Sequence, residues 1–167
     1  MSLSGCDQFD LGLTPINDPS GFKGVIHFTN WPAADSVLEL RLVIFKNYPS
    51  ESTNLIVTVL NALINGEGDI VIYPVIGTTG WQGRYSTDSL AYTITTSGTT
   101  LQVGQYNYVA LAWRYGTNYM TDWKPAGVYS LTNDVNAPSP LRVLLHKTTG
   151  GIDINVDFHN LPPRPWQ

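Results

Sequence analysis

Gly104–Arg114 reads Gly-Gln-Tyr-Asn-Tyr-Val-Ala-Leu-Ala-Trp-Arg, and its pattern indicates the architecture of the chain. Its apolar residues alternate as in a β-strand, in which successive side chains point to opposite faces. One predicted face holds Tyr106, Tyr108, Ala110 and Ala112, and the other holds Val109, Leu111 and Trp113. Because both faces are apolar, we expect a central strand with protein packed on each side.

Ser89–Thr95, just upstream, also alternates and places Leu90, Tyr92 and Ile94 on one face. A Ser97-Gly98 turn separates it from the central stretch. The pattern predicts an antiparallel hairpin with a long loop.

Further strands are predicted on both sides of this pair, at Phe22–Thr29, Ser36–Lys46 and Asp69–Val75. In Ser36–Lys46 the alternation predicts that Leu38, Leu40, Leu42 and Ile44 face the core and that Glu39 and Arg41 face water. Leu141–Leu145 and Ile152–Phe158 are expected to form a last hairpin that turns at residues 148–151. Ile152, Ile154, Val156 and Phe158 would point inward.

Thr53–Gly66 is ambiguous between strand and helix. Its β-branched residues favour a strand, whereas its length, the Thr53 cap and the Asn65-Gly66 stop favour a short helix, which we expect. With about seven strands and no βαβ alternation, the pattern predicts a mainly β protein, an antiparallel β-sandwich with one inserted helix. The folded domain should span residues 21–160, between an N-terminal tether (1–20) and a C-terminal tail (161–167).

Composition narrows the class of protein. The 167 residues are 43% hydrophobic and only 13% charged, with a net charge of −4 and no basic cluster, so nucleic-acid binding is not expected. Cys6 is the single cysteine, which excludes an internal disulfide. No apolar run reaches the roughly 20 residues of a membrane-spanning helix.

Leu3-Ser4-Gly5-Cys6 resembles the lipobox of bacterial lipoproteins. The resemblance implies that Cys6 is acylated and tethers the protein to a membrane of the bacterial cell envelope, on the periplasmic side or at the cell surface. The alternative is a chance tetrapeptide ahead of an ordinary free thiol.

Three stretches are similar to the transthyretin-like (prealbumin-like) sandwich of carboxypeptidase regulatory domains. They are Gly24–Phe28, Leu40–Phe45 and Gly104–Ala110, which together cover about a third of the chain. Members of this group serve mostly as structural, stalk or binding modules, so the resemblance implies an accessory function without catalysis or cofactor.

The sequence shows no established catalytic motif: a Gly-x-Ser-x-Gly elbow and a phosphate loop are both missing. A small hydrolase with two convergent carboxylates is the enzymatic alternative. The only metal ligands considered are Asp153, Asp157 and His159, and we favour the simpler interpretation that these carboxylates keep an outer strand soluble.

Aromatic residues outside the predicted strands are the distinctive feature. Trp81, Tyr115, Tyr119 and Trp123 lie in loops among Gly, Asn and Asp, and could bind the faces of sugars or a protein partner. Alternatively, these rings cap the ends of the core. We therefore predict a binding or structural module whose partner is another envelope protein or a glycan. A sugar-binding module would require two exposed, coplanar loop tryptophans.

Overall fold

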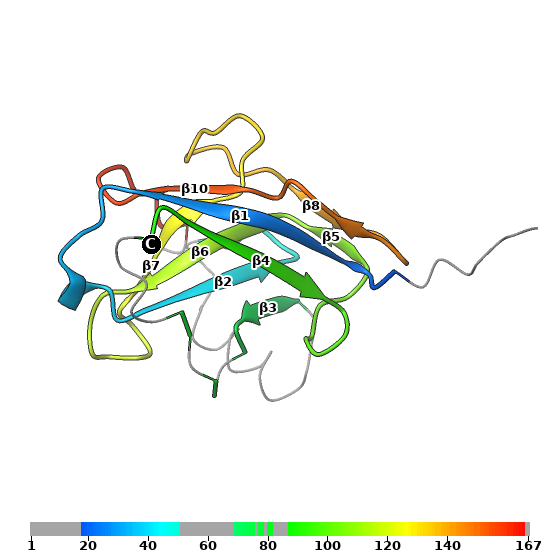
Figure 1. Cartoon of the computed structure of the whole chain (residues 1–167), viewed down its shortest axis with the longest axis horizontal. Helices are drawn as coiled ribbons and strands as arrows, with labels where there is room; N and C mark the ends of the chain where they lie inside the picture. Colours follow the sequence, from blue (N-terminus) through cyan, green and yellow to red (C-terminus); the bar gives the residue numbers. More distant parts are fainter. Residues whose placement is uncertain (1–17, 51–68, 76, 79, 82–86, 166–167) are drawn as a thin grey trace, which may run out of the picture.

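The computed structural model describes residues 18–50, 69–75, 77–78, 80–81 and 87–165. Within them the chain is mainly β and sandwich-like, with strands in two layers (Figure 1), which confirms the predicted class. A 3-10 turn at Ala34–Ser36 is the one helical segment of this described part. The helix expected at Thr53–Gly66 lies outside it.

The first sheet is built on β1 (Gly21–Thr29), in the order β10-β1-β4. The antiparallel partner of β1 is β4 (Ser89–Thr95). Its other partners, β9 (Thr148–Thr149) and β10 (Ile154–Asp157), run parallel to it. The expectation of a wholly antiparallel sandwich is therefore wrong at β1, because the chain crosses between layers before it returns to this strand.

The second sheet has the order β3-β2-β6-β7, with every pair antiparallel. Its strands are β3 (Ile70–Tyr73), β2 (Glu39–Phe45), β6 (Tyr108–Arg114) and β7 (Trp123–Val128). A separate short pair joins β5 (Gly104–Tyr106) to β8 (Leu141–Val143). As predicted, β6 is a central strand, flanked by β2 and β7.

Ten strands are described where about seven were expected. The central stretch divides into β5 and β6, and β7 and β9 were not predicted from the sequence. Both predicted hairpins are wrong: β4 belongs to the first sheet and β6 to the second, while β8 pairs with β5 and β10 with β1. The segment after β4 leads to the separate β5–β8 pair, and the predicted turn at residues 148–151 contains β9, which pairs with β1.

The main core fills the space between the layers. Inward-facing residues of both sheets form it, among them Phe22, Ile26, Leu42, Leu111, Ile154 and Val156. Ile152, Ile154, Val156 and Phe158 are all buried, as predicted. A smaller core lies on the opposite face of the second sheet and consists of Phe45, Ile70, Tyr108, Ala110 and Val128.

Asn107 separates these two cores. Its backbone N–H donates to the carbonyl oxygens of Phe45 (2.9 Å) and Lys46 (3.2 Å), in the gap between β5 and β6. As a result Tyr106 enters the main core and Tyr108 enters the smaller one. The prediction that both tyrosines share a face is therefore wrong, because the strict alternation stops at this residue.

Glu39 and Arg41 were expected to face water, and this is also wrong. Both are buried, with 3% and 4% of their surface exposed. They form an ion pair, and Glu39 also accepts a hydrogen bond from Arg114 Nε at 3.1 Å. Arg41 donates in addition to three backbone carbonyls after β3, at Pro74, Val75 and Thr78. The face of β2 that carries Glu39 and Arg41 is therefore covered and contains a buried polar network. Through its bonds to these carbonyls, Arg41 holds the segment that follows β3 against β2.

Candidate functional site

The loop at residues 115–122, between β6 and β7, carries two of the four predicted binding aromatics, Tyr115 and Tyr119, and Trp123 follows as the first residue of β7. Asp122 and Asn118 order it: the Asp122 carboxylate accepts the Asn118 N–H at 2.9 Å, and the Asp122 N–H donates to the Asn118 carbonyl at 3.0 Å. Asn118 Oδ1 also accepts the Met120 N–H at 3.0 Å. A Cβ at Gly116 would meet the Asp122 carboxylate, so a larger residue there requires that side chain to move. These contacts order the loop internally.

One side of the loop presents Tyr119. Its ring packs edge-on against Trp123 at 5.6 Å, and the Trp123 indole N–H donates to the Tyr119 carbonyl at 2.7 Å. The Arg114 guanidinium lies 5.4 Å from the centre of the Tyr119 ring. Tyr119 and Met120 remain exposed, whereas Trp123 is half-buried. The rings of this pair are nearly perpendicular (87°), so they do not form a flat platform.

The other side presents Tyr115 with two cations. Lys124 Nζ lies 4.0 Å from the centre of the Trp113 ring and 5.0 Å from that of Tyr115. The Arg164 guanidinium, from the C-terminal segment, lies 5.5 Å from the same Tyr115 ring. We call Tyr115, Lys124 and Arg164 the cation patch. Aromatic faces attract such cations, which fixes both side chains beside one partly exposed ring.

Among the described residues, the cation patch has no counter-ion. The ion pairs of the described residues join Arg41 and Arg114 to Glu39, and Lys46 to Asp69, and none includes Lys124 or Arg164. Burial, and second the nearby charge of Arg164, lower the pKa of Lys124 below its ordinary value. An incoming carboxylate would offset both effects, so the patch is suited to an anionic group.

Trp81 does not join this surface. It bridges Leu40 on the side of β2 away from β6, and its ring packs edge-on against Tyr73 at 5.8 Å. It is half-buried against the main core, as is Trp31, whose indole N–H donates to the Thr87 carbonyl. These two tryptophans cap the core, which is the alternative that the sequence left open.

The weak metal candidates are engaged in hydrogen bonds between neighbouring segments. Asp153 accepts the Val25 N–H at 2.8 Å, and Asp157 accepts from the Asn30 amide (2.8 Å) and from the His159 N–H (2.9 Å). The Asn30 bond and, second, the His159 bond lower the pKa of Asp157. Over the described residues, no group of three or more His, Cys, Asp or Glu side chains could hold a metal ion.

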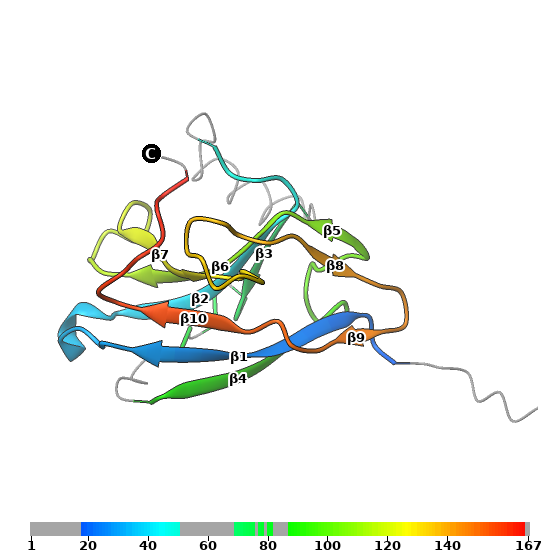
Figure 2. The same cartoon turned by 90° about the horizontal axis from the view of Figure 1, so that it is seen from above.

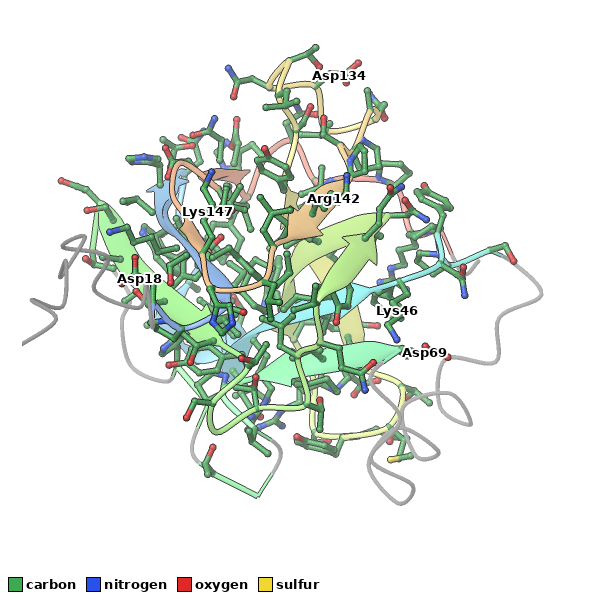
Figure 3. All side chains as sticks on the ribbon, turned by 90° about the vertical axis from the view of Figure 1, so that its right-hand side faces the viewer. Asp18, Lys46, Asp69, Asp134, Arg142 and Lys147 are labelled. Carbon is green, nitrogen blue, oxygen red and sulfur yellow. The ribbon has the colours of Figure 1, made fainter. Side chains whose placement is uncertain are left out.

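Other surface charges are dispersed (Figure 3). Lys46 and Asp69 pair at 3.1 Å, while Asp134, Arg142 and Lys147 lie apart on the loops and strands nearby. Arg142 and Lys147 are exposed and have no aromatic partner in the part of the chain that is described. The cation patch is thus distinguished from ordinary surface cations by its rings.

Of the aromatic residues predicted from the sequence, Tyr119 and Trp123 contact each other, whereas Tyr115 lies on the other side of the loop, against Trp113 and Lys124. Lys124 and Arg164 were not predicted. The signal for Lys124 was its position after Trp123 at the start of a strand, opposite Trp113 in the neighbouring strand. No local signal could find Arg164, because only the fold brings the C-terminal segment to this loop.

No family model, curated protein or solved structure matches this chain. Among the described residues, no helix has the length and apolar character needed to cross a membrane. Cys6 lies outside these residues.

Proposed function

We propose that this chain is a non-catalytic binding module of the bacterial cell envelope, tethered to a membrane through acylated Cys6. Its cation patch would capture an acidic segment of another envelope protein. The observation that carries the proposal is that Lys124 and Arg164 share the Tyr115 ring without a carboxylate partner among the described residues.

The chemistry of the surface favours a protein partner. Exposed Tyr119 and Met120 lie beside half-buried Trp123 and Arg114, and these are residue types enriched at protein interfaces. Sugar stacking by paired loop tryptophans has less support, since Trp31 and Trp81 pack on the core and Trp123 meets Tyr119 edge-on. We also propose that the sandwich is transthyretin-like. The three similar stretches, which lie in β1, β2 and β5–β6, support this assignment.

A titration of the isotope-labelled full chain tests the patch. The probes are poly-L-glutamate, polygalacturonate and neutral cellohexaose, and the readout is the NMR shift of the Trp113 indole and the Tyr115 and Lys124 amides. We expect poly-L-glutamate to move these signals, and the double change Lys124→Gln/Arg164→Gln to weaken binding at least about tenfold, since two charge-assisted contacts are lost.

Arg142→Gln/Lys147→Gln is the matched control, because it removes the same charge from exposed sites outside the patch. Equal weakening by both double variants would reduce the effect to net charge and contradict the proposal. Shifts produced by cellohexaose alone would favour the sugar-binding alternative, and a stronger response to polygalacturonate than to polyglutamate would favour an acidic glycan.

A further inference from the structure

β4 forms one border of the first sheet, and its outward backbone groups can be assigned from the register. Phe28 N–H donates to the Asp88 carbonyl, and Thr96 N–H donates to the Ser20 carbonyl. Gly24 is opposite Tyr92 in the same ladder. Because hydrogen-bonded residues alternate in an antiparallel pair, the even-numbered residues of β4 bond to β1 and the odd-numbered residues direct their N–H and C=O groups outward.

Within the described residues, the middle of this border is unpaired. The Ser89 and Thr95 carbonyls accept hydrogen bonds from the Thr87 and Thr99 hydroxyls. The outward N–H and C=O groups of Ala91 and Thr93 have no partner in the described part of the chain. Figure 2 shows β4 along the outer border of its layer.

This border lacks the usual protection against strand addition. Proteins guard exposed edges with charged residues, prolines, bulges or very short strands. Ser-Leu-Ala-Tyr-Thr-Ile-Thr contains no charge and no proline, and its pairing with β1 is regular over seven residues. The border strands β10, β3 and β7 of the two main sheets each carry a protective feature. β10 is bridged by Tyr129 at Ile154, β3 is only four residues long, and β7 contains Pro125 beside a register shift.

We propose that a second copy of this chain pairs with β4 antiparallel, about a two-fold axis at Tyr92. Ala91 of each copy then exchanges both backbone hydrogen bonds with Thr93 of the other, and Ser89 meets Thr95. The two sheets join in the order β10-β1-β4-β4-β1-β10, with the core-facing residues of both copies on the same side. Such a contact is isologous, as two-fold dimers require.

The side chains of β4 favour a second copy over a foreign strand. The exposed residues Ser89, Ala91 and Thr93 are small and uncharged, so identical strands meet without repulsion. The same residues offer no charge that would select an acidic or basic peptide. This surface is separate from the cation patch, so the two proposals can fail independently.

Two double variants of the full chain test the register. Ala91→Lys/Thr93→Lys places like charges opposite each other across the axis, whereas Ala91→Lys/Thr93→Glu places a lysine of each copy opposite a glutamate of the other. By sedimentation equilibrium we expect the first to raise the dimer dissociation constant at least about tenfold and the second to keep it within about threefold of the unsubstituted chain. Both positions are exposed, so circular dichroism should show both variants folded.

Hydrogen exchange supplies the second readout. The Ala91 and Thr93 amides should exchange rapidly in dilute protein and become protected as concentration rises. A chain that stays monomeric up to about 1 mM, with fast exchange at both amides, overturns the proposal. A dimer in which these amides stay unprotected also overturns it, as does equal weakening of the dimer by the two double variants. Protection that appears only when a foreign peptide is added would likewise contradict it.

Discussion

Glu39 shows how much depends on a single buried carboxylate. It accepts from Arg114 and pairs with Arg41, whose guanidinium in turn holds the carbonyls of Pro74, Val75 and Thr78. Removing one member of a buried charge network leaves the others uncompensated, which is more costly than losing a surface pair.

We therefore expect Glu39→Gln to lower the free energy of unfolding by about 3 kcal/mol. Asp69→Asn is the control, because it breaks the more exposed pair with Lys46 and should cost less than about 1 kcal/mol. Urea denaturation measures both. Equal losses in the two variants would show that burial adds nothing to the Glu39 network.

The same residue explains one failure of the sequence analysis. Glu39 and Arg41 alternate with core leucines, and charged residues in that pattern ordinarily face water. Their burial depends on Arg114 and on the carbonyls after β3, which lie far away in sequence. Alternation predicts which residues share a face of a strand, but it does not predict whether that face is covered.

Among the strands, the parallel pairing of β1 with β9 and β10 depends on a close contact between the backbones of Gly24 and Ile152. Gly24 lies where the parallel partner changes from β9 to β10, and a Cβ there would collide with the Ile152 carbonyl oxygen. Ile152 N–H donates to the Lys23 carbonyl, and the Asp153 carboxylate accepts the Val25 N–H in place of a backbone carbonyl. Any side chain at Gly24 must push these strands apart.

Gly24→Ala should accordingly lower the free energy of unfolding by at least about 2 kcal/mol, because it overpacks backbone against backbone. Gly150→Ala is the matched control, since its nearest neighbour would be Lys23 Cε at 3.6 Å. That change should alter stability by less than about 1 kcal/mol. Thermal unfolding followed by circular dichroism compares them, and a Gly24 variant as stable as the Gly150 variant would refute the close contact.

Strands were easier to predict than their partners. The positions of β1, β2, β3, β4 and β6 follow from local apolar patterns, because burial of one or both faces of a strand requires apolar residues within that segment. The pairing partner of a strand does not follow from such a local pattern. The turns after β4 and β8 resemble hairpin turns but lead to strands of other sheets. In the site, the rings could be predicted from the loop composition, whereas Arg164 depends on the path of the C-terminal segment.

For the whole molecule, buried tyrosines should make the free energy of unfolding decrease at alkaline pH. Burial is the largest cause that raises the pKa of Tyr92, Tyr106, Tyr108 and Tyr129 above the ordinary value of 10.0. The folded state thus retains protons that the unfolded chain releases. This contribution to stability is complete below about pH 10 and is lost as pH rises toward the folded pKa values.

We expect the urea midpoint to fall between about pH 9.5 and 11.5, and phenolate absorbance from these four residues to appear together with loss of near-ultraviolet circular dichroism. Tyr108→Phe should reduce this fall, and it is a mild change because the Tyr108 hydroxyl has no hydrogen-bond partner in the described structure. Titration of all tyrosines near pH 10 without unfolding would contradict the prediction.

The break at Asn107 has a consequence for how the protein melts. Tyr106 is buried in the main core and Tyr108 in the smaller core, and only Asn107 lies between them in the chain. Disruption of either core therefore displaces the backbone that positions the tyrosine of the other. Neither core can unfold independently while β5, Asn107 and β6 keep their structure. Heat should therefore dismantle the strand framework in a single calorimetric transition.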